Sequence, residues 1–335
     1  MKRALYFSTY FNPIQDNRHY VMLYYALETL SAFHPFDFDV VVFCATPGKN
    51  DIAEYNHKGL YNIVRDFPWV KFYNSDYFER FGYEQDAHFM HKWYHLKSVF
   101  DLGYEQVFYS DADVIFMKNP TFLFDVYDSE TCLYMPKVSD KHAFKLIEDV
   151  YRYSADDRYG RSSSNWILHK KVFDTLPETY YDEVCDIRRQ YVRDAEALFG
   201  EDAIKTTPFS EQYAGTLLFL KYSRILDWKD GSHFAWGEEG DLWDTDFTVD
   251  GVKTVKKDIV MWHYTGGKAP IACRKDLLTD HMIEERKKIH DWLVWYKTGL
   301  IYTKEESSVR DSDSKALLSV DNDALRTYKE NRAKR

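Results

Sequence analysis

Residues 106–120, Gln-Val-Phe-Tyr-Ser-Asp-Ala-Asp-Val-Ile-Phe-Met-Lys-Asn-Pro, contain the motif that decides the fold expected of this chain. Residues 107–109 are apolar and β-prone and predict a buried strand; a second apolar run, 114–117, follows Asp111 and Asp113. Two carboxylates between buried strands repel each other and lose hydration. The free-energy cost is high unless a cation lies between them. Their oxygens suit a hard divalent ion such as Mn²⁺, with Mg²⁺ as the alternative, and such an ion can also hold a diphosphate.

The Asp-x-Asp triplet by itself is a weak signal in an acidic chain. It recurs at Asp37/Asp39, Asp244/Asp246, Asp311/Asp313 and Asp321/Asp323. Most of these copies are expected to be solvated turns or caps, because only the copy at Asp111 has a strand-like run on both sides. That context predicts a metal or phosphate site at residues 111–113.

The order of apolar runs along the chain predicts an α/β fold. Strands are expected at 4–9, 40–44 and 70–73, and helices at 20–33, 59–66 and 91–101. This alternation favours a largely parallel sheet with a nucleotide-type crevice at its carboxyl edge. Further strands are expected at 131–135, 166–169 and 259–262, and further helices at 141–154, 182–199, 211–222 and 280–295. We predict one domain over residues 1–302 and a polar tail over 303–335.

Composition excludes several classes of protein. The net charge of −10 argues against a nucleic-acid partner, which selects for basic patches. No apolar run approaches the ~20 residues of a transmembrane helix, and Met1-Lys2-Arg3 leads directly into the first expected strand, so neither a membrane span nor a signal peptide is predicted. The four cysteines form no Cys-x-x-Cys pair and are expected to be free thiols of a reducing compartment, which favours a cytoplasmic location.

A second informative stretch is 259–270, Ile-Val-Met-Trp-His-Tyr-Thr-Gly-Gly-Lys-Ala-Pro. An expected strand ends at His263, a glycine pair allows close approach of backbone to a ligand, and Lys268 follows. Such a loop can supply a third metal ligand, backbone N–H groups and a cation for a diphosphate. The plainer alternative is a turn in which His263 caps the strand and Lys268 is solvated.

Together, the strand-flanked Asp-x-Asp and the later His-x-x-Gly with a nearby lysine resemble glycosyltransferase family 8. The resemblance implies a GT-A fold, a single α/β domain with a Rossmann-like mixed sheet, and retaining, Mn²⁺-dependent transfer from a nucleotide-activated hexose. It implies metal ligands at Asp111, Asp113 and His263, and catalytic residues at Glu211 and Gln212. Nucleotide-sugar contacts are expected at Ser8, Thr9, Tyr10, Lys97, Asp111, Ala112, Ser164, Gly266 and Lys268.

Two departures from the family pattern concern the donor sugar. Lys268 comes one residue earlier than the usual His-x-x-Gly-x-x-Lys spacing, and Ser162 stands where the family has asparagine, unless Asn165 takes that role in a shifted register. The resemblance covers about residues 2–270, and only the stretches around Asp111 and His263 are specific.

The expected activity is transfer of a hexose from UDP-glucose or UDP-galactose to a glycan or a small hydroxyl acceptor. Three alternatives stay open: a sugar-phosphate nucleotidyltransferase, a non-catalytic carbohydrate-binding relative, and a retaining transferase of another GT-A family. A nucleotidyltransferase is expected to have a glycine-rich loop after the first strand, and residues 8–12 contain no glycine. Three tryptophans, Trp228, Trp236 and Trp243, flank the acidic stretch 227–246 and fit either an acceptor rim or a core.

Overall fold

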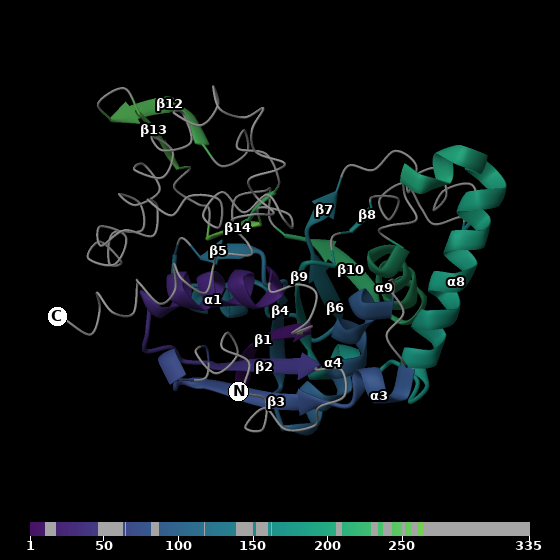
Figure 1. Ribbon diagram of the computed structural model, residues 1–335, viewed down its shortest axis with the longest axis horizontal. Coiled ribbons are helices and arrows are strands. Elements are labelled where there is room, and N and C mark those ends of the chain that lie inside the picture. Colours follow the sequence, from purple (N-terminus) through teal and green to yellow (C-terminus); the bar gives the residue numbers. More distant parts are fainter. Residues whose placement is uncertain are drawn as a thin grey trace.

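The protein is described here by a computed structural model (Figure 1). It describes residues 1–10, 18–45, 63, 65–81, 87–116, 118–138, 150–151, 160–161, 163–205, 210–228, 234–236, 243–249, 252–255 and 260–263. The expected helices at 141–154 and 280–295, most of the one at 59–66, and the tail from 303 lie outside these residues.

A seven-stranded mixed sheet forms the centre of the fold, in the order β10-β6-β9-β4-β1-β2-β3. Its strands are β1 (Arg3–Tyr10), β2 (Asp39–Ala45), β3 (Val70–Ser75), β4 (Gln106–Ser110), β6 (Cys132–Met135), β9 (Asn165–His169) and β10 (Arg224–Asp227). Strand β1 is parallel to both β2 and β4, whereas β9 is antiparallel to β4 and β6. The carboxyl ends of β1 and β4 therefore meet at one edge, where the predicted nucleotide and metal residues lie.

Helices cover both faces of this sheet. They are α1 (Arg18–Ser31), α3 (Tyr77–Phe81), α4 (His91–Asp101), α5 (Thr121–Val126), α7 (Lys170–Phe173), α8 (Tyr180–Phe199) and α9 (Ser210–Tyr222), with 3-10 turns η1 (Ala87–Met90) and η2 (Gly200–Lys205). Helices α8 and α9 lie together beside β10 (Figure 1). The predicted spans 20–33, 91–101, 182–199 and 211–222 are thus helical, with ends shifted by at most two residues.

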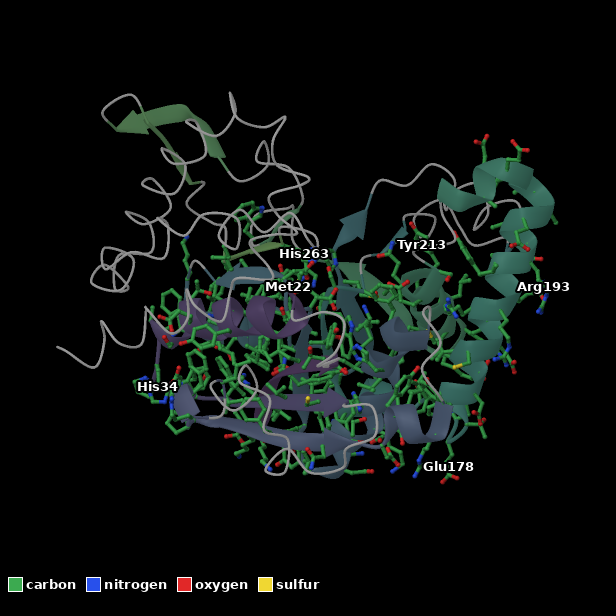
Figure 2. All side chains as sticks on the ribbon, viewed as in Figure 1. Met22, His34, Glu178, Arg193, Tyr213 and His263 are labelled. Carbon is green, nitrogen blue, oxygen red and sulfur yellow. The ribbon has the colours of Figure 1, made fainter. Side chains whose placement is uncertain are left out.

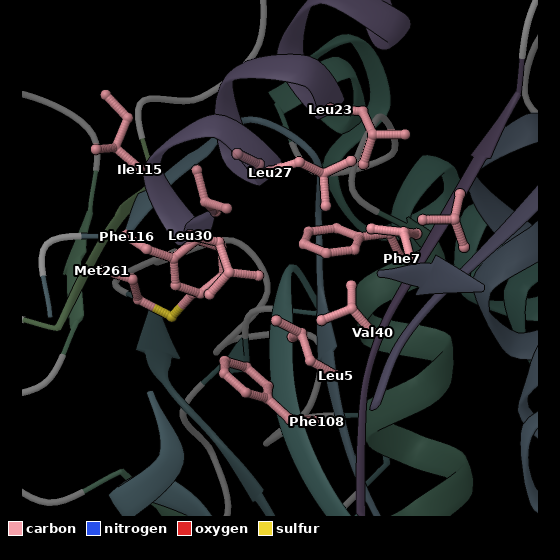
Figure 3. Close-up of a cluster of buried hydrophobic side chains, with 14 of the residues drawn as sticks. Leu5, Phe7, Leu23, Leu27, Leu30, Val40, Phe108, Ile115, Phe116 and Met261 are labelled. Atoms are coloured by element: carbon pink, nitrogen blue, oxygen red, sulfur yellow. The ribbon is translucent and has the colours of Figure 1, made fainter. Parts of the chain in front are cut away.

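The alternation of side chains along β1 builds two separate cores. Leu5 and Phe7 face α1, where Leu23, Leu27 and Leu30 are fully buried at helical spacing (Figure 3). The neighbouring residues Ala4 and Tyr6 face α4 and α9 on the other side. Each fully buried leucine contributes roughly 1.5–3 kcal/mol to folding. Burial on both faces accounts for the continuous apolar run in β2.

A second, three-stranded sheet, β11-β14-β5, determines the position of the carboxylates. It consists of β11 (Phe234–Trp236), β14 (Met261–His263) and β5 (Val114–Phe116), and three residues separate the end of β4 from the start of β5. Strand β14 is antiparallel to β5, with His263 opposite Val114. The remaining strands form two pairs, β12 (Trp243–Val249) with β13 (Val252–Val255), and β7 (Lys137–Val138) with β8 (Gly160–Arg161).

The structure also bears on the sequence expectations for Trp228, the cysteines and membrane-spanning helices. Trp228 is buried in the core against Phe108 and Tyr127, so it is not part of an acceptor rim. The side chains of Trp236 and Trp243 lie outside the described residues. The cysteines that the structure describes, Cys44, Cys132 and Cys185, form no disulfide. Within the described part of the chain, we find no helix whose length and apolarity would allow it to cross a bilayer.

Candidate functional site

Three potential metal ligands lie close together at the turn between β4 and β5. Asp111 and Asp113 occupy the turn between the two strands, and His263 ends β14; one ligand atom from each lies within 4.8 Å of the others. His263 Nε2 is 2.8 Å from Asp113 Oδ1. The three ligands are separated by up to 152 residues in sequence and are brought together by the β14–β5 pairing. Two carboxylates and an imidazole are a donor set that suits Mn²⁺, so the residues fit the predicted ion.

Asp111 is held in place by three neighbouring groups. Its backbone N–H donates to the Ser164 carbonyl oxygen over 2.6 Å. The Tyr109 hydroxyl donates to Asp111 Oδ1 over 2.5 Å, and the Lys92 ammonium lies 3.5 Å from the same oxygen. Lys92 also donates to Ser163 Oγ over 2.9 Å, and its side chain is only 4% exposed. An ammonium this deeply buried needs such partners, because desolvation of an unpaired charge is costly.

Burial and charge together shift the titration of the cluster. Burial raises the pKa of Asp111 above its ordinary value, Asp113 adds to this, and Lys92 opposes it. Burial lowers the pKa of His263, but the adjacent Asp113 carboxylate outweighs this effect and the net shift is upward. The cluster therefore holds protons more tightly than isolated side chains would, and a bound cation would compete with those protons.

Among the described residues, Lys92 is the lysine that contacts the cluster, whereas Lys97, the lysine predicted from the sequence, lies away from it. Lys97 is exposed, and its ammonium pairs with Asp101 one turn further along α4, over 2.6 Å. Five residues on an α-helix correspond to a rotation of about 140°, so the two lysines point to different sides. One sequence signal distinguishes them: Lys92 shares a helical stripe with Leu96 and Val99, which face the core.

The predicted catalytic pair lies at the start of α9, close to this cluster. Glu211 and Gln212 are both buried, at 8% and 7% exposure. Burial raises the pKa of Glu211; the charge of Lys92 lowers it and that of Asp111 raises it, which places the Glu211 carboxylate in the same electrostatic environment. The Glu211 carboxylate therefore lies within electrostatic reach of Lys92 and Asp111, although β4 and α9 are about 100 residues apart in sequence. The catalytic roles of Glu211 and Gln212 stay predictions.

The predicted nucleotide residues Ser8 and Thr9 lie at the carboxyl end of β1. Ser8 Oγ is 2.5 Å from His91 Nδ1 and 2.6 Å from His95 Nδ1, and His95 Nε2 is 2.5 Å from Ser75 Oγ. One hydroxyl can donate only one proton, so two neutral imidazoles can both hydrogen-bond to Ser8 only as opposite tautomers. The Thr9 hydroxyl is buried without a hydrogen-bond partner among the described residues.

This serine–histidine network makes a testable contribution to stability. Burial lowers the pKa of His95 to about 3, whereas an unfolded histidine titrates near 6.5. Between these values the unfolded state binds the extra proton, so stability must fall as pH drops from about 6.5 to about 3, by up to about 1.4 kcal/mol per pH unit. Urea unfolding at several pH values should show this slope, and His95→Gln should reduce it. An unchanged slope in His95→Gln would contradict the assignment.

The remaining predicted residues fall into two groups. Ala112 lies between the two aspartates, and Ser164 is buried with its carbonyl on Asp111; both are therefore at the site. Asn165 is fully buried and its Oδ1 has no hydrogen-bond partner among the described residues. Gly266, Lys268 and Ser162, together with the side chain of Tyr10, lie outside the described residues, so their roles stay predictions.

Comparison with known proteins supports the fold. Neither a protein-family model nor a curated protein sequence matches the chain. The crystal structure of galactosyltransferase LgtC, in complex with donor and acceptor sugar analogues, is 14% identical, with a TM-score of 0.50 over 80% of this chain and 88% of LgtC. The bifunctional glycosyltransferase WbbM is 14% identical over 80% of this chain and 46% of its own, at TM-score 0.48. Mouse xyloside xylosyltransferase 1 is 9% identical over 79% and 98%, at TM-score 0.46.

The likeness to LgtC concerns the arrangement of the chain and not its chemistry. At 14% identity it extends over 80% of this chain and 88% of LgtC. The protein therefore has the GT-A type of α/β fold.

Proposed function

We propose that this protein is a glycosyltransferase that moves a hexose from a UDP-sugar to a hydroxyl acceptor, with retention of anomeric configuration. The observation that carries the proposal is the convergence of Asp111, Asp113 and His263 within 4.8 Å, beside a buried lysine. A bound Mn²⁺ would supply positive charge to a departing diphosphate. LgtC, a galactosyltransferase solved in complex with donor and acceptor sugar analogues, is consistent with this chemistry.

The residues around the cluster have distinct roles in this proposal. The bond that breaks joins the anomeric carbon to the diphosphate, and the bond that forms joins the same carbon to the acceptor oxygen. The acceptor proton passes to the departing UDP, which balances the step. Lys92 stabilises negative charge on the diphosphate, since an ammonium in a dry site acts strongly on developing charge. Glu211 and Gln212 face the opposite side of the sugar, where a carboxylate or an amide oxygen stabilises positive charge on the ring.

The proposal predicts that Glu211 and Gln212 affect the transfer step and not nucleotide binding. Glu211→Gln and Gln212→Ala should each lower turnover roughly 100-fold and leave UDP affinity intact, because neither residue holds the diphosphate. UDP release from UDP-glucose and UDP-galactose measures turnover, calorimetry with UDP and MnCl₂ measures affinity, and NMR of the product gives its anomeric configuration. Normal turnover in both variants, or an inverted product, would contradict the assignment.

The same assays separate the alternatives. A nucleotidyltransferase would release pyrophosphate from UTP and a sugar 1-phosphate, and a non-catalytic relative would bind sugar without releasing UDP. Mn²⁺-dependent UDP binding without either reaction would retain the site and reject the transferase.

A further inference from the structure

Three consecutive residues of α4 contact three different parts of the site. His91 contacts Ser8 on β1, and Lys92 contacts Asp111 after β4. Trp93, which is fully buried, donates from its indole Nε1–H to the backbone carbonyl of Glu211 over 3.2 Å. The first two contacts concern the nucleotide and metal residues. The third reaches the helix that carries the predicted catalytic pair, and the proposed function does not use it.

Gly215 shows how closely α9 rests on Trp93. A Cβ atom added at Gly215 would lie 2.0 Å from Trp93 Cζ2 and 2.5 Å from Cη2, far below any real contact distance. Glycine in a helix interior costs about 1 kcal/mol relative to alanine, so its presence here needs a reason. That reason is the approach of the helix backbone to the outer ring of the indole. The Trp93 indole therefore packs directly against the backbone of α9 at Gly215 and also donates a hydrogen bond to the Glu211 carbonyl.

A column of stacked rings connects Trp93 to Asp111. The Trp93 and Trp166 rings are parallel within 2°, with centroids 5.6 Å apart, and Trp166 stacks on Tyr109 at 5.1 Å. Tyr109 in turn donates its hydroxyl hydrogen bond to Asp111. The same column therefore contacts α9 at one end and the metal-binding turn at the other. Stacked aromatic rings contribute roughly 0.5–1.5 kcal/mol per pair beyond their buried area.

The other side of α9 is held by α8. Tyr213 stacks on Tyr191 with ring centroids 5.1 Å apart, and Arg188 donates from Nε to Ser210 Oγ over 3.1 Å. Tyr213 and the long helix α8 can be followed in Figure 2. With α8 on one side and Trp93 on the other, the first turn of α9 has little room to shift.

We infer that Trp93 is a positioning residue that sets the place of Glu211 and Gln212 relative to Asp111. This inference rests on the proposed function for its catalytic meaning, and its geometry is independent of that function. Misplacement of a reacting group by about 1 Å can cost roughly 100-fold in rate. Trp93 is thus predicted to affect the transfer step and not nucleotide binding.

A double-mutant cycle between Trp93 and Gly215 tests this inference. Gly215→Ala should lower turnover roughly 100-fold, because its methyl group pushes α9 off the indole. Trp93→Leu should lower it roughly tenfold through loss of one hydrogen bond. Leucine has no ring and ends short of Cζ2, Cη2 and Cε2, the three indole atoms that an added Cβ would meet. The double variant should therefore match Trp93→Leu alone and not show the roughly 1,000-fold product of the two losses.

Three measurements give the readouts: UDP release from UDP-glucose or UDP-galactose, calorimetry with UDP and MnCl₂, and hydrogen exchange of residues 210–216. UDP affinity should stay within about twofold in all variants. Exchange should speed up in Gly215→Ala and be restored in the double variant. Trp228→Leu is the matched control, because Trp228 is also buried but packs against Phe108 and Tyr127 in the other core. It should lower the melting temperature without changing turnover.

Two results would overturn the inference: multiplicative losses in the double variant, or UDP affinity that falls in step with turnover. A failure of the proposed function gives a different result: the wild-type protein would release no UDP. The hydrogen-exchange data would then still show whether Trp93 positions α9.

Discussion

Replacement of Asp111 and Asp113 by asparagine is expected to abolish Mn²⁺-dependent UDP binding. Changes to groups that only orient a metal ligand typically cost 10–100-fold in metal affinity, so loss of two ligands should exceed roughly 100-fold. The fold should persist with some loss of stability: asparagine keeps the shape of each side chain and removes the repulsion between the two carboxylates, but the buried Lys92 ammonium loses its carboxylate partner. In the wild type, Mn²⁺ should raise the melting temperature through binding to the folded state, and in the variant it should not.

The control is a second Asp-x-Asp of the same chain. Asp37 and Asp39 lie at the amino end of β2, where they pair with Arg3 and Lys71. Asp37→Asn/Asp39→Asn also removes two negative charges. A modest loss of stability is expected, with unchanged UDP binding. Calorimetry with UDP and MnCl₂, together with thermal melts, compares the two double variants. UDP binding that survives the change at Asp111 and Asp113 would reject the metal site.

Lys92→Met is expected to weaken UDP binding by roughly 100-fold, equal to about 3 kcal/mol, because the ammonium is buried where a diphosphate would lie. Methionine keeps the length and apolar stem of the side chain. The same change removes a positive charge that repels a cation, so the affinity for Mn²⁺ without nucleotide should not fall. This contrast separates a lysine that holds phosphate from one that only supports Asp111.

Lys97→Met on the same helix is the matched comparison. Its ammonium is 57% exposed and pairs with Asp101 at i+4, an interaction worth about 0.3–0.5 kcal/mol. Near-normal UDP binding is expected. Weakened binding in Lys97→Met together with normal binding in Lys92→Met would restore the sequence-based choice of lysine. Isothermal titrations with MnCl₂ alone and with MnCl₂ plus UDP measure both quantities.

The sequence alone predicts most of the central sheet and its helices. The continuous apolar run of β2 and the helical spacing of α1 each carry their own local signal. The two ligand-bearing stretches are also local features, since Asp111, Asp113 and His263 each follow a β-prone run. The resemblance to a family added the expectation that these stretches meet. The structure confirms the mixed α/β fold and places the three side chains together.

Other features depend on contacts between residues distant in sequence. Neither the antiparallel insertion of β9 nor the pairing of β14 with β5 has a signal within either strand, because register is set by which faces are buried. The sequence leaves the location of Trp228 undecided for the same reason, since a tryptophan in an acidic stretch suits an acceptor rim or a core equally well. Only the packing of Phe108 and Tyr127 around it decides for the core.

What the sequence by itself determined is the set of groups available to the site: two carboxylates and an imidazole at strand ends, lysines on α4, and an acid–amide pair at the start of α9. What only the tertiary structure decided is which of the two α4 lysines lies beside Asp111 and which side chain contacts the helix that carries the acid–amide pair. Lys92 and Lys97 are equivalent as residue types, and a rotation of about 140° between them separates the buried site from solvent. Glu211 lies on a helix that contacts Trp93, more than 100 residues away, because α9 approaches the indole closely at Gly215 and the indole N–H donates to the Glu211 carbonyl.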